Sequence, residues 1–127
     1  MYTIKAESFA LELTPVADFI KIKVCSEGFY AESCFDTEDL LITDFAFQLN
    51  EMYQKLDGSS IIRDLYETDS YIEFIAHKRG HITVRGQIIC TRGRHTQQLT
   101  FENEIEQTYL RDYVSALTAD YAKYAEQ

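Results

Sequence analysis

Three histidines lie within a short basic stretch of this sequence, and histidine nitrogens are common ligands for zinc. They are His77, His81 and His95, and Cys90 lies between the last two. Structural zinc sites usually show closely paired ligands, such as CxxC, and many catalytic zinc sites show the helical HExxH pattern. Neither pattern occurs here, and the neighbouring lysine and arginines would repel a metal ion. The sequence therefore predicts no metal site and no cofactor.

The cations around these histidines suggest an anion site instead, because arginine forks suit phosphate. Residues 70–95 carry five bases and one acid, although the whole chain has a net charge of −9. No glycine-rich loop opens a helix here, so the phosphate signal is weak. A solvated edge paired with acids, a contact for an acidic partner and one half of a self-complementary homodimer remain open. This basic patch comprises His77, Lys78, Arg79, His81, Arg85, Arg92, Arg94 and His95.

Two groups of carboxylates could act as general acids and bases if their surroundings shifted their pKa values. Their polar surroundings in the sequence favour exposure, and therefore solvation or recognition of a basic partner. The chain has no GxSxG motif and no cysteine at a convincing helix start, so we predict no catalytic residues and no enzyme. The acids on and around the first helix are Asp36, Glu38, Asp39, Asp44, Glu51 and Asp57, of which the first four form the first candidate group, and the second group is Glu102, Glu104 and Glu106.

Charge and composition limit the class of protein further. A net charge of −9 argues against direct nucleic-acid binding, which requires cations to neutralise phosphates. Three cysteines without a CxxC pair indicate reduced thiols. No stretch approaches the ~20 apolar residues that cross a bilayer, and MYTIKAESF lacks the features of a secretory signal. We expect a cytoplasmic protein without a membrane partner, with one domain over residues 1–127.

A predicted β-hairpin over residues 71–90 positions most of the basic patch. Apolar and polar residues alternate in YIEFIAH and again in HITVRGQIIC, which is the period of a half-buried strand. Gly80 ends the connecting turn, because glycine accepts the positive φ of a short hairpin loop. This register directs Ile82, Val84 and Cys90 towards the core.

Three strands are expected before the first helix. Residues 4–13 form the first strand, which Pro15 stops because proline cannot donate a hydrogen bond to a sheet. Residues 19–25 and 29–35 form a hairpin around a glycine-containing turn, with Phe29 facing the core.

The first group of acids lies at the start of a predicted helix. Asp36 or Thr37 caps this helix, and Gly58 ends it in the left-handed conformation. A strand at 59–66 leads into the central hairpin, and a last strand at 97–103 precedes a helix that begins at about Glu106. The apolar stripe of the first helix is Leu41, Phe45, Leu49, Met52 and Leu56.

The order of these elements is βββαββββα. Short turns join consecutive strands, which favours antiparallel pairing. We therefore predict an α+β fold with a mainly antiparallel sheet of about seven strands and two helices packed on one face.

Several stretches, read in order, resemble the WapI family of small bacterial immunity proteins and a closely similar family of uncharacterised bacterial domains. The resemblance covers most of the chain, although each stretch is a packing pattern and not a catalytic signature. The stretches are FALEL at 9–13, SEGFYAES at 26–33, DLLITDFAFQLNEMYQKLDGSS at 39–60, RGHITVRGQI at 79–88 and LTFENEIEQTYLRDYVSAL at 99–117.

The resemblance implies a non-enzymatic protein that neutralises the toxin domain of a polymorphic or contact-dependent bacterial toxin. If that toxin is a basic nuclease, the acids of either group would take the place of substrate phosphates, and exposed Tyr109 and Tyr113 would act as anchors. The alternative is a small regulatory module that binds an anionic ligand through the basic patch. Charge reversal at Asp39 and Asp44 should weaken only toxin binding, whereas Arg85→Ala or Arg92→Ala should weaken only anion binding.

Overall fold

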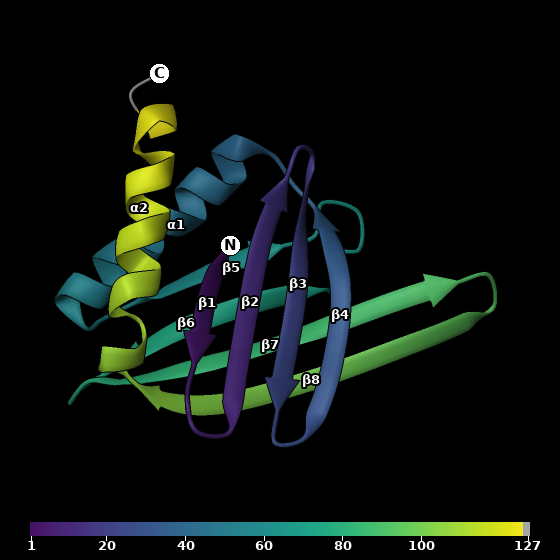
Figure 1. The fold of residues 1–127 in the computed structure, drawn as a ribbon, viewed down its shortest axis with the longest axis horizontal. Coiled ribbons are helices and arrows are strands. Elements are labelled where there is room, and N and C mark those ends of the chain that lie inside the picture. Colours follow the sequence, from purple (N-terminus) through teal and green to yellow (C-terminus); the bar gives the residue numbers. More distant parts are fainter. Residues whose placement is uncertain (126–127) are drawn as a thin grey trace.

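The structure, a computed structural model, describes residues 1–125 and contains two α-helices and eight strands in the order ββββαββββα. The strands form two antiparallel sheets, β1-β2-β3-β4 and β5-β6-β7-β8 (Figure 1). This confirms the α+β class and the antiparallel pairing. The elements are β1 (Tyr2–Lys5), β2 (Phe9–Val16), β3 (Phe19–Ser26), β4 (Phe29–Asp36), α1 (Asp39–Lys55), β5 (Ser59–Arg63), β6 (Tyr71–His77), β7 (His81–Arg92), β8 (His95–Glu106), a short 3-10 helix η1 (Gln107–Tyr109) and α2 (Arg111–Ala125).

The structure has one more strand than expected, and it has two sheets where one was expected. The predicted first strand is a hairpin, because the chain turns at residues 6–8 and the Ala6 amide donates to the Phe9 carbonyl over 2.8 Å. Pro15 does not stop β2, which continues to Val16. Pairing with β1 ends at Leu13, so at Pro15 only the β3 side of the strand is paired. A proline is tolerated at such an edge position.

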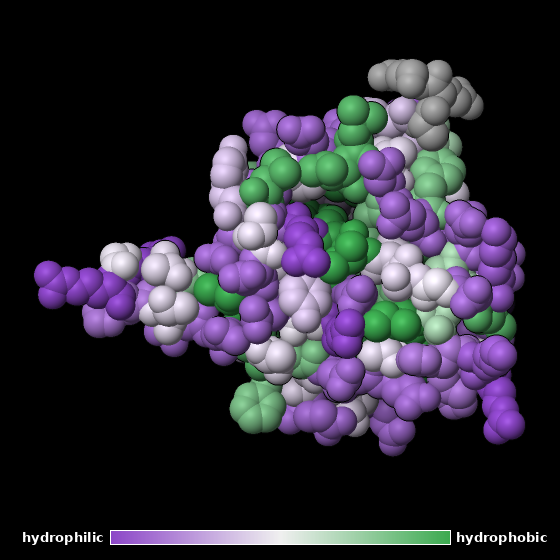
Figure 2. Space-filling model, turned by 180° about the vertical axis from the view of Figure 1, so that it is seen from behind, coloured by the Kyte–Doolittle hydropathy of each residue, from purple (hydrophilic) through white to green (hydrophobic). Residues whose placement is uncertain are grey.

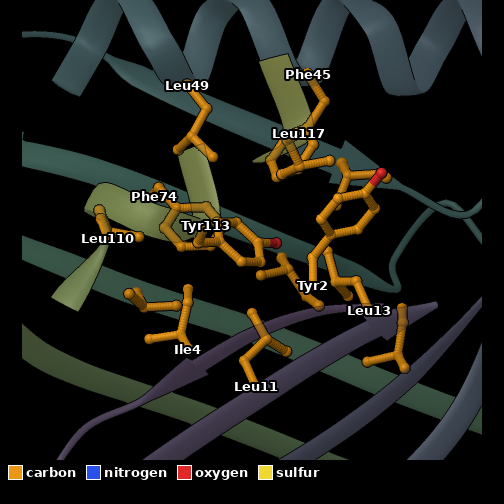
Figure 3. Packing of buried hydrophobic residues seen from close by; sticks show 14 of the residues in the cluster. Tyr2, Ile4, Leu11, Leu13, Phe45, Leu49, Phe74, Leu110, Tyr113 and Leu117 are labelled. Carbon is orange, nitrogen blue, oxygen red and sulfur yellow. The ribbon is translucent and has the colours of Figure 1, made fainter. Parts of the chain in front are cut away.

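The two sheets pack face to face, and their strands cross steeply in Figure 1. Helix α1 packs against β5, α2 packs against β1, and the helices pack against each other. Figure 3 shows how the layers meet: Tyr113 of α2 lies between Phe74 of β6 and residues of the first sheet. The Tyr113 ring centroid is 6.0 Å from that of Phe74 and 6.4 Å from that of Tyr2. Aromatic pairs at these separations stabilise a core beyond their buried area.

The central hairpin is confirmed, with Ala76 opposite Ile82 and His77 opposite His81. Ile82 and Val84 are fully buried as predicted, but Cys90 is exposed. Strands β7 and β8 continue beyond the edge of the first sheet as an arm (Figure 1). We call residues 88–99 the arm, with the buried Ile88 at its base. Cys90 lies on this arm, so the alternation of the strand persists there without a layer to cover it.

Phe29 was predicted to face the core, but 67% of its surface is exposed. The hairpin register is the predicted one, with Val24 opposite Ala31. Phe29 is the first residue of β4, directly after the turn that joins β3 to β4. Its side chain lies beyond the buried part of the sheet. Periodicity therefore predicted the register correctly and the burial of this residue wrongly.

Helix α1 begins and ends differently from the prediction. Its N-cap is Glu38 and neither Asp36 nor Thr37, since Asp36 still belongs to β4 and Thr37 precedes the N-cap. Glu38 makes no side-chain capping bond. Leu56, with φ of 51°, ends the helix in the left-handed conformation, two residues before Gly58. The buried face is Ile42, Phe45, Ala46, Leu49 and Met52, whereas Leu41 is 38% exposed.

Candidate protein interface

The first group of acids lies where β4 ends and α1 begins. Asp36 ends β4, Glu38 caps α1, and Asp39 and Asp44 lie in its first half. The loop between β5 and β6 packs against this region, since the Leu65 amide donates to the Asp36 carbonyl over 3.1 Å. Two chain segments, 36–44 and 61–69, therefore form one surface.

The β5–β6 loop brings three further acids, which sequence analysis did not select. They are Asp64, Glu67 and Asp69. Together the two segments carry seven acids and one base, Arg63. In residues 1–125 none of these seven carboxylates lies within 4.0 Å of a basic nitrogen. The surface is therefore strongly negative, and its carboxylates form no ion pair with any base in the described part of the chain.

Asp64 differs from the other acids because it is almost buried, with 9% exposure. Its Oδ1 accepts hydrogen bonds from the Asp36 amide over 3.3 Å and the Tyr66 amide over 3.1 Å. A carboxylate that accepts backbone amides holds a loop in one conformation. Asp64 thus joins the loop to the end of β4.

Large apolar side chains are exposed among these acids. Tyr66 is 83% exposed and Leu40 61%, and Leu41 and Leu65 are exposed to lesser degrees. Between α1 and β5 lies a groove of about 380 Å³, and Figure 2 shows a hollow bordered by hydrophobic and hydrophilic surface on this side of the molecule. We call the surface of residues 36–44 and 61–69 the acidic groove. The wall of the hollow includes Leu41, Asp44, Ile61, Arg63 and Leu65 of this surface together with the adjacent Gln48.

Apolar side chains at the centre of a polar rim are typical of protein interfaces. The sequence held a signal for them that was not used. Leu40, Leu41 and Ile42 are three consecutive apolar residues, and a helix cannot turn all three towards one core. Ile42 is in phase with Phe45 and Leu49, which leaves the two leucines for solvent or a partner.

The second group of acids has different surroundings. Glu102, Glu104 and Glu106 alternate along β8 on its exposed face, opposite Arg85, Thr83 and His81 of β7. Glu104 Oε1 lies 3.2 Å from His81 Nδ1, so bases are interleaved with these acids. Their negative charge is therefore partly compensated within the sheet.

The two tyrosines selected from the sequence have different environments. Tyr109 is 44% exposed and shares a shallow pocket with Glu104 and Glu106. The expectation that Tyr113 is exposed is wrong, since it is 2% exposed and packs in the core. Burial raises the pKa of its hydroxyl well above the usual value, and nearby Tyr2 adds to that shift. Tyr113 therefore contributes to the core and cannot contact a partner from this position.

The structure divides the basic residues between the two ends of β7. His77, Lys78, Arg79 and His81 surround the β6–β7 turn, whereas Arg92, Arg94 and His95 surround the β7–β8 turn. A strand of this length separates the turns by roughly 35 Å. Arg85 lies between them and donates to Glu73 over 2.8 Å, a bond that raises the pKa of its guanidinium. These residues do not converge on one anion.

No group of three or more His, Cys, Asp or Glu side chains among residues 1–125 is arranged to hold a metal ion. His77 Nε2 lies 2.7 Å from the Thr83 hydroxyl, and His81 contacts Glu104. The three cysteines, all in the described part of the chain, are free and exposed. Within that part, no helix is long and apolar enough to cross a membrane.

The fold defines a small α+β protein, and one of its surfaces combines uncompensated acids with exposed apolar side chains. The sequence profile of the Immunity protein WapI-like family matches residues 18–125, and the chain belongs to that family. No curated protein and no solved structure matches the chain. The resemblance noted in the sequence is thus confirmed. Family membership implies a cognate toxin as the partner and its neutralisation as the role, in a family that is typically non-enzymatic.

Proposed function

We propose that this protein neutralises its toxin by binding the toxin domain, without catalysis, through the acidic groove. The observation that carries the proposal is that segments 36–44 and 61–69 combine seven carboxylates, none ion-paired within residues 1–125, with the exposed side chains of Leu40, Leu41, Leu65 and Tyr66. Uncompensated like charges repel one another, and exposed apolar side chains remain in contact with water, so both features lower the stability of the free protein. A surface that keeps both is therefore typical of a binding site for another protein.

The two features serve different steps of binding. An uncompensated negative surface accelerates encounter with a basic partner, and the effect weakens as salt increases. Apolar side chains that become desolvated at the centre of the contact then hold the complex together. If the toxin is a nuclease, its cleft is basic, and the carboxylates take the positions of substrate phosphates.

The three exposed thiols support a site of action in the cytoplasm, where thiols remain reduced. The alternative role, an anion-binding module, requires cations that converge on one ligand. The separation of the basic residues along β7 does not favour it, so the basic patch is left as a surface that balances nearby acids.

Growth rescue tests the proposal. The toxin domain, taken from a large secreted protein encoded next to this chain, is expressed with and without it, and growth is followed. We expect the chain to restore growth and to co-purify with the toxin domain. Asp39→Lys with Asp44→Lys should weaken the complex by about 100-fold at low salt, because two favourable contacts become repulsive.

The matched control is Glu7→Lys with Asp57→Lys, which changes the net charge equally at exposed positions outside the acidic groove. If both double variants weaken binding equally, net charge and not this surface determines affinity. If the toxin domain is harmless, or remains toxic with this chain present, neutralisation itself is wrong.

A further inference from the structure

Strand β4 is an outer strand of the first sheet, and its outer edge is open. Of the four outer strands, β1 packs against α2 and β5 packs against α1. Within residues 1–125, strand β4 has β3 on one side and no strand on the other. Natural proteins usually protect such edges with prolines, lysines or a covering element, because an open edge pairs with other chains. Strand β4, with the sequence FYAESCFD, contains neither residue type.

Hydrogen bonds at Asp36 establish which backbone groups of β4 face outward. The Asp36 amide donates to Asp64 Oδ1, and its carbonyl accepts from the Leu65 amide, so both groups point away from β3. In an antiparallel pair this orientation alternates. The amides and carbonyls of Tyr30, Glu32 and Cys34 therefore face outward too. None of these six groups has a hydrogen-bond partner within residues 1–125.

The arm provides a floor beneath this edge. Beyond β4, the core face of the second sheet continues along β7 and β8 with no strand of the first sheet above it (Figure 1). A groove of about 410 Å³ lies between β4 and the arm. Phe29 and Tyr30 flank it and are 67% and 62% exposed. Its lining from the arm is Ile88, Cys90, Gln97, Gln98 and Leu99.

We infer that β4 is a strand-addition site, at which an extended segment of the toxin domain pairs with Tyr30, Glu32 and Cys34. This inference rests on the proposed function, because it names the toxin as the occupant. Unpaired, alternating backbone groups fit an extended chain, which would gain main-chain hydrogen bonds along about six residues, roughly 20 Å. Alternate side chains of the added strand would face the arm and should be apolar.

Two further observations favour a toxin segment at this edge. The β4 edge leads directly into the acidic groove at Asp36, so one partner can contact both. The other open edge, β8, carries Glu102, Glu104 and Glu106 on alternate residues, which is the charged type of edge that discourages pairing. The β4 edge has only Glu32 among its three outward-facing residues.

The test compares Glu32→Pro with Glu32→Ala in binding to the toxin domain. Proline removes an outward amide and leaves the bonds to β3, whereas alanine removes only the carboxylate, which accepts the Tyr30 hydroxyl over 2.9 Å. Loss of one main-chain bond and of strand pairing should weaken the complex at least tenfold relative to Glu32→Ala.

Amide hydrogen exchange of the unaltered chain gives a second readout that no folding defect can affect. Toxin binding should slow exchange at Tyr30, Glu32 and Cys34, with little change at Ala31 and Ser33, which already bond to β3. Unchanged exchange at the three amides, or a Glu32→Pro complex as tight as that of Glu32→Ala, overturns strand addition and leaves neutralisation intact. Failure of the unaltered chain to bind the toxin domain overturns both.

Discussion

Two acidic regions of this protein contain the same residue types but differ in what surrounds each carboxylate. On the exposed face of β6, β7 and β8, Glu73 and Glu102 lie on either side of Arg85, and Glu104 contacts His81. The acidic groove contains seven carboxylates and only one base, Arg63, within its two segments. None of these carboxylates makes an ion pair within the described residues. Counts of charge along the sequence cannot separate these two cases.

The difference indicates distinct roles for the two regions. Paired charges on a sheet face satisfy one another and hold the register of the strands, each contributing less than about 1 kcal/mol. Carboxylates without partners add little to folding, but they generate a field that a basic partner experiences at a distance. We therefore expect variants of the sheet to alter stability and variants of the acidic groove to alter binding.

The largest effect should come from disturbing the sheet alone, by Gly86→Ala in β7. An added Cβ would lie 2.5 Å from the Tyr71 carbonyl oxygen and 2.8 Å from a ring carbon of Phe101. The strands must move apart, so the free energy of unfolding should fall by about 3 kcal/mol in urea denaturation. In Gly93→Ala a methyl group meets open space, and only the positive φ costs about 1 kcal/mol. Equal stability of these two variants would contradict the close packing at Gly86.

A comparable change in the acidic groove should act on binding instead. Tyr66→Ala removes an exposed ring and should weaken toxin binding by about 2 kcal/mol, roughly 30-fold, in calorimetric titration. The melting temperature of the Tyr66→Ala variant should equal that of the unaltered protein. Tyr71→Ala on the sheet face, which removes a ring beneath the Arg63 guanidinium, should reduce stability and leave affinity within about twofold. The reverse result would exchange the roles of the two regions.

Asp64 should be the exception within the acidic groove, because its carboxylate has a structural role. Asp64→Ala leaves the amides of Asp36 and Tyr66 without their acceptor and should cost about 1.5 kcal/mol of stability. Both bonds end on Oδ1, so Asp64→Asn retains them and should recover most of that loss while removing the charge. Chemical denaturation of the two variants measures the difference, and equal losses would assign the effect to charge.

The smallest effect should be that of the ion pair between Arg85 and Glu73. A double-mutant cycle with Arg85→Ala and Glu73→Ala should give a coupling free energy of about 0.5 kcal/mol that declines with salt. Toxin affinity should be unaffected in all three variants. A loss of toxin affinity on Arg85→Ala would instead place this sheet face in the contact with the toxin.

The sequence predicted the elements well where local patterning acts alone. Alternation specified the register of the hairpin from Tyr71 to Cys90, because a shift of one residue would expose every apolar side chain. The turn at Gly28 similarly specified the pairing of Val24 with Ala31. The first helix was predicted with its buried residues Phe45, Leu49 and Met52.

Burial at the ends of elements was less predictable. Phe29 and Cys90 follow the alternation of their strands, yet no layer covers either of them. Tyr113 is buried because α2 packs against α1 and β1, with its ring beside Phe74 of the second sheet, contacts that the sequence of the helix alone does not specify. Whether a side chain is covered depends on elements distant in the sequence.

The sequence by itself therefore determined the order and type of the elements apart from the division of the first strand into β1 and β2, the antiparallel pairing of neighbours and the membership of an immunity family. Only the tertiary structure decided that the strands form two sheets, that residues 61–69 join the acids of α1, and that the basic residues separate along β7. The physical reason is the range of the interactions. Periodicity and turn chemistry act over a few residues, whereas a surface is assembled by packing between segments that the chain keeps far apart.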